Sequence, residues 1–181
     1  MDIEELLHIG ADKISINTNA YKDMNLITES ANKFGSQCIV VSMDAKKVGQ
    51  NYEVYINRGS ESINISPVDW AIEVENRGAG EILLNSIDYD GSRKGYDLEL
   101  MKMVSDVVQI PVIAFGGVFQ WQHMAEALEV GMWGNMCSAD DGSVPRVMGA
   151  LCRCVGTSAK VETGTVARRM PVTERLRLDS S

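Results

Sequence analysis

Strand-like and helix-like segments alternate along the first 130 residues, and this alternation limits the possible fold more than any other feature of the sequence. The run Cys38–Met43 (CIVVSM) is almost continuously apolar and rich in β-branched residues, which is typical of a parallel strand buried on both faces. Alternating units predict an α/β fold, either a closed (β/α)8 barrel or an open doubly wound sheet. Trp70 and Trp121 are expected to pack helices against this sheet. The predicted strands are Lys13–Ile16, Cys38–Met43, Glu81–Ile87 and Val112–Phe115, with an excursion at Tyr52–Ile56; the helices are Ile3–Ile9, Asn25–Phe34, Val68–Arg77, Leu98–Val108 and Gln120–Val130.

The composition changes near Gly131. Residues 1–131 carry ten basic and 20 acidic side chains, a net charge of −10, whereas residues 132–181 carry seven basic and five acidic ones, a net charge of +2. Arginine replaces lysine in the second segment, and the hydrophobic periodicity fades. We therefore predict one α/β domain over residues 1–131 and an atypical, poorly ordered tail over residues 132–181.

The charge and the apolar runs argue against several classes of protein. With a net charge of −8 over 181 residues, the chain is not expected to bind nucleic acid or an anionic membrane, although a local phosphate site remains open. No uncharged apolar run approaches the roughly 18 residues of a membrane span, and the start, MDIEELLHIG, is acidic where a signal peptide is basic. We therefore predict a cytoplasmic protein. The cysteines form no CxxC pair, so we expect reduced thiols and no bound metal, and no cofactor is predicted.

Polar residues and glycines gather where the predicted strands end. A single Asp after a strand usually caps a turn or helix, but four successive strand ends of this kind favour a shared site, because parallel strands end at one edge. Carboxylates there can transfer protons. Gly-rich turns can present backbone N–H groups to phosphate, or can simply be tight turns that need glycine. In chain order these residues are Asn17, Thr18, Asp44, Asn85, Asp88, Asp90, Gly116 and Gly117.

Five segments, in the same order, resemble the cyclase subunit of imidazole glycerol phosphate synthase. They are GADKISINT (Gly10–Thr18), FGSQCIVVSMDAKK (Phe34–Lys47), GAGEILLNSIDYDG (Gly78–Gly91), KGYDLEL (Lys94–Leu100) and IPVIAFGG (Ile110–Gly117). The likeness covers about residues 3–130 and implies a partial (β/α)8 barrel, with about strands four to seven. It also implies a lyase of histidine biosynthesis, which uses ammonia from a glutaminase partner subunit. That enzyme converts a phosphorylated ribulosyl-formimino nucleotide into imidazole glycerol phosphate and an aminoimidazole carboxamide ribotide.

The resemblance also implies roles for single residues. Asp44 matches the catalytic Asp of the family's fifth strand, which transfers a proton. The opposite end of the family's barrel has a charged gate for ammonia and the surface that docks the glutaminase. The residues that match the substrate and phosphate loops are Asn17, Thr18, Asn85, Asp90, Gly91, Ser92, Gly116 and Gly117; those at the gate and partner interface are Asp12, Lys13, Gln37 and Glu81.

Departures from the family pattern leave alternatives open. Nothing in the chain matches the first three strands or the partner catalytic Asp, so Asp88 or Asp90 would have to replace that Asp or a second chain would have to supply it. No eighth strand is recognised after Gly131. Phe115 and the Ser60–Ile65 loop resemble the branch that amidates lipopolysaccharide sugars, so this activity is one alternative. Another is an inactive partial barrel that binds a glutaminase or itself, because an unclosed sheet leaves edges and an apolar face exposed.

Overall fold

The computed structural model describes residues 3–129, 133–134 and 158–160 of the chain. Over these residues, helices and strands alternate as predicted. The helices are α1 (Ile3–His8), α2 (Thr18–Lys22), α3 (Asn25–Phe34), the 3-10 turn η1 (Ser36–Cys38), α4 (Pro67–Asn76), α5 (Leu98–Ser105) and α6 (Trp121–Glu129). The strands are β1 (Lys13–Ile16), β2 (Ile39–Val48), β3 (Asn51–Ile56), β4 (Glu61–Ser62), β5 (Glu81–Ser86), β6 (Val112–Phe115), β7 (Trp133–Gly134) and β8 (Ser158–Lys160).

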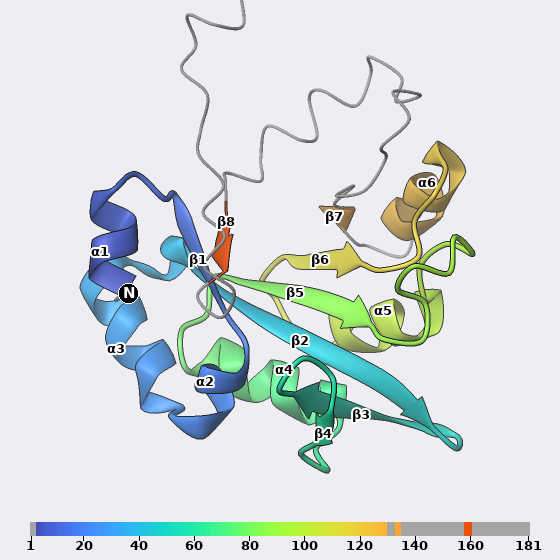
Figure 1. Ribbon diagram of the computed structural model, residues 1–181, viewed down its shortest axis with the longest axis horizontal. Coiled ribbons are helices and arrows are strands. Elements are labelled where there is room, and N and C mark those ends of the chain that lie inside the picture. The colour runs from blue at the N-terminus through green and yellow to red at the C-terminus, as the bar shows by residue number, and fades with distance from the viewer. Residues whose placement is uncertain (1–2, 130–132, 135–157, 161–181) are drawn as a thin grey trace, which may run out of the picture.

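All the described strands belong to one sheet. β1, β2, β5, β6 and β7 lie parallel in this spatial order, and β8 pairs in parallel with β1. β3 is antiparallel to β2 and β4 is antiparallel to β3, which confirms a two-stranded excursion after β2. Among the described strands no pairing joins β7 to β8, so the sheet is open (Figure 1). Four successive strand–helix units with parallel strands fit part of a (β/α)8 barrel, as predicted.

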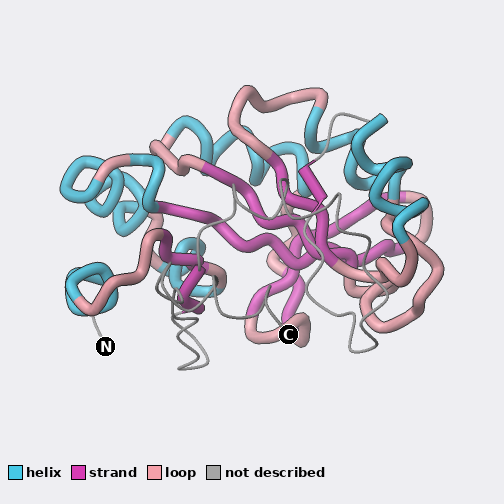
Figure 2. The backbone as a smooth tube through the Cα atoms, turned by 90° about the horizontal axis from the view of Figure 1, so that it is seen from above, coloured by secondary structure: helices cyan, strands magenta, loops and turns pink. Residues whose placement is uncertain are grey.

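The two faces of the sheet differ because successive side chains of a strand point to opposite faces. One face packs on the helices through Ile14, Val41, Met43, Ile82 and Leu84, none of which is exposed to solvent. Figure 2 shows the helices in an arc outside the strands. The other face, called the inner face below, mixes polar and apolar residues. By strand alternation and register it carries Lys13, Ser15, Val40, Ser42, Asp44, Glu81, Leu83, Asn85, Ile113 and Phe115.

Local sequence explains where the helices begin. Ser66 Oγ accepts a hydrogen bond from Asp69 N at 3.1 Å, and Pro67 occupies the first position of α4, where its missing N–H costs nothing. The side chain of Asp97 caps α5 by accepting from Leu100 N at 3.2 Å. These caps fix the point at which each strand-to-helix loop ends.

The predicted elements are confirmed with shifts at their ends. The bounds of β1, α3 and β6 are as predicted. β2 continues beyond Met43 to Val48, because β3 pairs with its second half from Asp44 onward. α5 ends at Ser105, before the predicted Val108.

One expectation is wrong, and one short strand was not predicted. Trp70 packs as predicted, 3% exposed and edge-on to the ring of Tyr21, but Trp121 is 55% exposed at the start of α6. The sequence shows no strand pattern after Gly131, yet β7 follows it and pairs with β6, because two residues are too few to show alternation. Apart from β7 and β8, the predicted tail over residues 132–181 lies outside the described residues.

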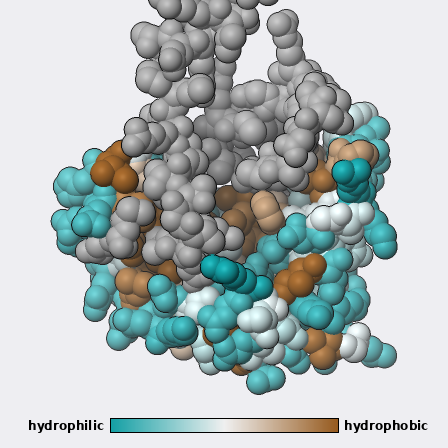
Figure 3. Space-filling view, viewed as in Figure 1, coloured by the Kyte–Doolittle hydropathy of each residue, from teal (hydrophilic) through white to brown (hydrophobic). Residues whose placement is uncertain are grey.

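On the side drawn in Figure 3, separate apolar patches are surrounded by hydrophilic residues. The most exposed large apolar side chains are Ile9 (62%), Trp121 (55%) and Phe119 (51%). Within the described residues, no helix combines the length and apolar character that crossing a membrane requires.

Candidate active site

Asp44 lies at the C-terminal ends of the parallel strands, between two amide side chains. Asn17 Nδ2, just after β1, donates to Asp44 Oδ2 over 2.9 Å. Asn85 Nδ2, the register partner on β5, donates to Asp44 Oδ1 over 2.9 Å. The carboxylate is therefore held from both sides by neutral donors, and it is half-buried. A carboxylate that is fixed in orientation and still accessible is suited to proton transfer.

The path of β2 explains this arrangement. β1 pairs with β2 only up to Ile16, opposite Val41, and β3 then takes over that side of β2 from Asp44 onward. Asn17 stands at the N-cap of α2, but its side chain makes no cap bond and reaches Asp44 instead. The side chain of Asn17 is thus committed to the carboxylate.

Thr18 links this corner to the turn between β3 and β4. Its Oγ1 accepts from the backbone N of Asn57 at 3.0 Å and donates to Asn17 Oδ1 at 3.4 Å. Asn17 and Thr18 are both buried, at 7% and 5% exposed. A second layer of hydrogen bonds therefore orients the amide that holds Asp44, while the predicted contact of Asn17 and Thr18 with phosphate stays a prediction.

Gly116 and Gly117 must be glycine for structural reasons. Their φ angles are +91° and +83°, in the left-handed region that favours glycine. A Cβ on Gly117 would lie 2.1 Å from the carbonyl oxygen of Gly95, whose N–H donates to Gly117 O over 2.9 Å. The loops after β5 and β6 are thus in close contact and joined by a backbone hydrogen bond. This confirms the tight turn, while the phosphate role of these glycines stays a prediction.

The two carboxylates after β5 have different surroundings. Asp88 Oδ2 accepts from the backbone N of Lys47 at 2.8 Å, so this side chain extends the contact between β2 and the end of β5. Asp90 and Gly91 are exposed and Ser92 is half-buried. Within the described residues, the Asp90 side chain makes no hydrogen bond, which leaves it available to a ligand.

The predicted gate residues meet at the opposite end of the inner face. Lys13 at the start of β1 and Glu81 at the start of β5 form an ion pair, with side chains 15% and 17% exposed. Asp12 and Gln37 are exposed in the segments that lead into β1 and β2. The structure confirms that Lys13 and Glu81 are in contact; the roles of all four residues stay predictions.

Three buried polar atoms have no hydrogen-bond partner among the described residues: Ser15 Oγ, Glu81 Oε2 and Asn85 Oδ1. All three belong to the inner face, between the Lys13–Glu81 pair and Asp44. Buried polar atoms are nearly always bonded, so these three atoms are available to water or to a polar ligand on this face.

Known proteins of one family are similar to this chain. The profile of the family described as histidine biosynthesis protein matches residues 1–138. The chain belongs to this family. It is 54% identical over 130 residues to the imidazole glycerol phosphate synthase subunit HisF of Hydrogenobaculum sp. (strain Y04AAS1), covering 71% of this chain and 52% of that protein.

Two further relatives give the same result. The subunit HisF of Campylobacter concisus (strain 13826) is 52% identical over 130 residues, covering 72% of this chain and 51% of that protein. The putative subunit hisF2 of Vibrio vulnificus (strain YJ016) is 53% identical over 130 residues, covering 71% and 48%. The resemblance found in the five segments is confirmed, and the chain spans about half the length of the curated relatives it matches.

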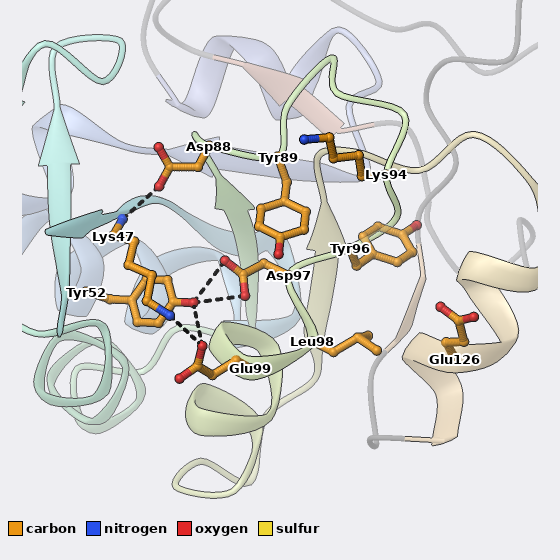
Figure 4. Close-up of a pocket in the computed structure, with 10 residues that line it drawn as sticks. All are labelled: Lys47, Tyr52, Asp88, Tyr89, Lys94, Tyr96, Asp97, Leu98, Glu99 and Glu126. Atoms are coloured by element: carbon orange, nitrogen blue, oxygen red, sulfur yellow. Dashed lines mark hydrogen bonds and ion pairs between the residues drawn. The ribbon is translucent and has the colours of Figure 1, made fainter. Parts of the chain in front are cut away.

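This member of the histidine biosynthesis protein family also has a cavity of about 580 Å³ beside Asp88 (Figure 4). The buried Asp97 lies at its base and accepts hydrogen bonds from Tyr52 OH at 3.0 Å and Ser86 Oγ at 3.1 Å, besides capping α5. Three elements, β3, β5 and α5, therefore meet at one carboxylate. The residues that line the cavity are Lys47, Tyr52, Asp88, Tyr89, Lys94, Tyr96, Asp97, Leu98, Glu99 and Glu126.

Burial and hydrogen bonds around this cavity shift the pKa values of Tyr52, Lys47 and Glu99. Burial, reinforced by the hydrogen bond to Asp97, raises the pKa of Tyr52 well above its usual range. Lys47 Nζ donates to Glu99 Oε2 over 2.7 Å, which raises the pKa of Lys47 and lowers the pKa of Glu99. The sequence did not predict this cluster, because Tyr52 and Asp97 are far apart in the chain and only the helix-cap position of Asp97 was a local signal.

Among the described residues, no three His, Cys, Asp or Glu side chains lie close enough together to hold a metal ion. Cys38, before β2, is half-buried and unpaired. Cys137, Cys152 and Cys154 lie outside the described residues.

Proposed function

We propose that this chain provides cyclase chemistry of the imidazole glycerol phosphate synthase type, in which ammonia reacts with a phosphorylated ribulosyl-formimino nucleotide. The products would be imidazole glycerol phosphate and an aminoimidazole carboxamide ribotide. The observation that carries the proposal is the Asp44 carboxylate, held between Asn17 and Asn85 where the strands end. Identity of 52–54% to relatives that bear this name supports it.

Asp44 is assigned the proton transfer. Its two hydrogen bonds come from amides, which fix the carboxylate without neutralising it, so it can take up and return a proton at the substrate. General acid–base catalysis of this kind typically contributes about 100- to 10,000-fold. Where a second carboxylate is needed, Asp90 is better suited than Asp88, because the latter is occupied by the backbone N of Lys47.

Substrate binding is assigned to the loops at the same edge. Asn85 adjoins Asp44, and its Oδ1 is buried without a partner among the described atoms. Gly116 and Gly117 are fixed against the loop after β5, and Asp90, Gly91 and Ser92 line the exposed part of that loop. Backbone N–H groups in such Gly-rich turns suit phosphate oxygens.

Ammonia entry is assigned to the other end of the inner face. Lys13 and Glu81 form an ion pair at that end, and Ser15 Oγ and Glu81 Oε2 have no hydrogen-bond partner among the described residues, so a small polar molecule can bind to them. A glutaminase subunit would dock near the exposed Asp12 and Gln37. This heterodimer would work in the cytoplasm with soluble substrates.

The test is ammonia-dependent turnover of the ribulosyl-formimino nucleotide, followed by the release of the carboxamide ribotide. The chain is assayed alone and with the half of a curated relative that the match does not cover. Turnover in either of these two samples supports the proposal. If neither sample shows turnover but the chain still binds a glutaminase, the result supports the alternative of an inactive partial barrel that only binds its partner. Sugar amidation is not proposed, because the three relatives named above all bear the synthase name.

A further inference from the structure

Asp44 lies at the point where β2 leaves the parallel sheet. From Asp44 onward, one side of β2 pairs with β3, and the other side pairs with β5 only as far as Ala45, opposite Ser86. Beyond Ala45, the described partner of β2 is β3 alone, and the two strands project past the end of β5 as a hairpin (Figure 1). A two-stranded hairpin is marginally stable by itself, so other contacts must fix its direction and, with it, the place of Asp44.

The buried Asp97 provides such a contact. The hydroxyl of Tyr52, in the projecting half of β3, donates to the carboxylate of Asp97 and lies 3.0 and 3.1 Å from its two oxygens (Figure 4). At the end of β5, Ser86 Oγ donates to Asp97 Oδ2 over 3.1 Å, and the N–H of Leu100 in α5 donates to Oδ1 over 3.2 Å. One carboxylate therefore joins the hairpin to β5 and to α5.

Capping α5 does not by itself explain this buried charge. Asp97 is 3% exposed, and the three groups that donate to it are neutral. Among the described residues it forms no ion pair. A buried charge without a counter-charge is costly unless several hydrogen bonds satisfy it. A Ser or Thr would also cap the helix, whereas a carboxylate has enough acceptor sites for the cap N–H and for both hydroxyls at once.

The residues that Asp97 anchors adjoin the Asp44 carboxylate. Ser86 follows Asn85, whose amide donates to Asp44 Oδ1 over 2.9 Å. Ala45 follows Asp44 and is the register partner of Ser86. A hairpin displaced from the end of β5 would therefore move Asp44 away from Asn85.

We propose that Asp97 is a positioning residue for the proton transfer: it holds the hairpin against the end of β5, so that the Asp44 carboxylate stays between Asn17 and Asn85. Asp97 takes no part in the chemistry, because it is buried and both of its oxygens accept hydrogen bonds from the protein. The inference rests on the proposed function and deepens it. A misplacement of about 1 Å in a reacting group can cost about 100-fold in rate, so the effect of this anchor is measurable.

Two variants loosen the anchor, and a third is the control. Asp97→Ser keeps a good N-cap for α5, but its side chain is too short to reach the hairpin and β5 as well. Tyr52→Phe removes only the bond from the hairpin. In the control, Glu75→Ala removes the acceptor of the N–H groups of Gln109 and Ile110, over 2.6 and 3.0 Å, at the opposite end of the sheet. The control lowers the thermal midpoint without touching the anchor.

The first readout is the side-chain amide signal of Asn17 in the ¹⁵N-labelled full chain. This amide donates to Asp44 Oδ2, on the side of the carboxylate away from β5, and Asp44→Asn shows where the signal lies once the carboxylate is lost. We expect Asp97→Ser to move the signal towards that position and Tyr52→Phe to move it less. Glu75→Ala is expected to leave it in place.

An unchanged Asn17 signal in Asp97→Ser overturns the proposal, and so does an equal shift in Glu75→Ala. If circular dichroism shows that Asp97→Ser is unfolded, Tyr52→Phe decides the question in the same way. An unchanged Asn17 signal in that variant then overturns the proposal.

The second readout is turnover, measured in the sample that converts the nucleotide. A displaced Asp44 is expected to lower kcat about 10- to 100-fold in Asp97→Ser and to change KM by less than about threefold, because Asp97 does not touch the substrate. An unchanged kcat, or a loss confined to KM, overturns the proposal. The expected Asn17 shifts without any turnover would contradict only the proposed function, whereas turnover with an unchanged Asn17 signal would contradict only the role of Asp97.

Discussion

Replacement of Tyr52 by Phe tests the cluster at Asp97 most sharply. Tyr52 is 5% exposed, and its hydroxyl donates to Asp97 at 3.0 Å, so the substitution removes one buried hydrogen bond to a carboxylate and keeps the ring. Hydrogen bonds to charged groups contribute about 1.5–3 kcal/mol, so we expect a loss of about 2 kcal/mol in the free energy of unfolding. For a folded unit of this size, such a loss lowers the melting temperature by roughly 4–16 °C.

Urea denaturation followed by circular dichroism measures this loss, and a neighbouring tyrosine gives the control. Tyr55, also on β3, is half-buried and its hydroxyl makes no hydrogen bond within the described residues, so Tyr55→Phe is expected to change stability by less than about 0.5 kcal/mol. In a double-mutant cycle with Asp97→Ala, the two losses must be less than additive by about 1.5 kcal/mol or more. Equal effects of the two Phe variants, or strict additivity, would refute the reasoning.

The same substitution has a pH signature. The pKa of Tyr52 is raised in the folded chain, so its contribution to stability is complete below the unfolded pKa of about 10 and is lost as the pH rises above that value. The stability difference between wild type and Tyr52→Phe should therefore shrink from pH 8 towards pH 11. A constant difference across this range would contradict the assigned cause.

Three further predictions concern the ends and the edges of the sheet. Glu81→Gln leaves Lys13 partly buried without its partner and should cost about 1–3 kcal/mol in denaturant unfolding; an unchanged midpoint would argue against the ion pair. Gly117→Ala should cost more than about 3 kcal/mol, because its φ is +83° and a Cβ would meet Gly95 O, whereas Gly91→Ala, in open space, should cost about 1 kcal/mol; similar losses for both would count against the packed loop. Light scattering of the purified chain should show self-association through the open sheet, and a compact, cooperative monomer would disagree.

The layout of the sheet was predictable because its signals are local. Cys38–Met43 is apolar enough to indicate a buried parallel strand, and the glycines and caps that follow each segment mark the ends of the helices. The position of Asp44 at the strand ends followed from the same alternation. Its role, and the pairing of Lys13 with Glu81, followed only from the resemblance, because no local pattern brings β1 and β5 together.

The features missed by sequence reasoning depend on contacts between distant residues. Tyr52 and Asp97 meet only when β3 folds back over the end of β5, and nothing near either residue signals that contact. The left-handed turn over Asn57, Arg58 and Gly59 was missed because Arg58, at its centre, is an unusual residue for that conformation. The exposure of Trp121 was missed because a large aromatic residue in a helix normally indicates packing.

The central claim is that Asp44 transfers the proton, and it is tested most directly by comparing turnover numbers for Asp44→Asn and Asp106→Asn. Both variants remove one carboxylate, but Asp106 is exposed at the end of α5 and pairs only with Lys102 among the described residues. We predict that ammonia-dependent turnover falls about 100- to 10,000-fold in Asp44→Asn, with folding unchanged, and stays at the wild-type rate in Asp106→Asn. Turnover by Asp44→Asn within about threefold of the wild-type rate would contradict the claim, because a proton-transfer group is expected to contribute at least about 100-fold.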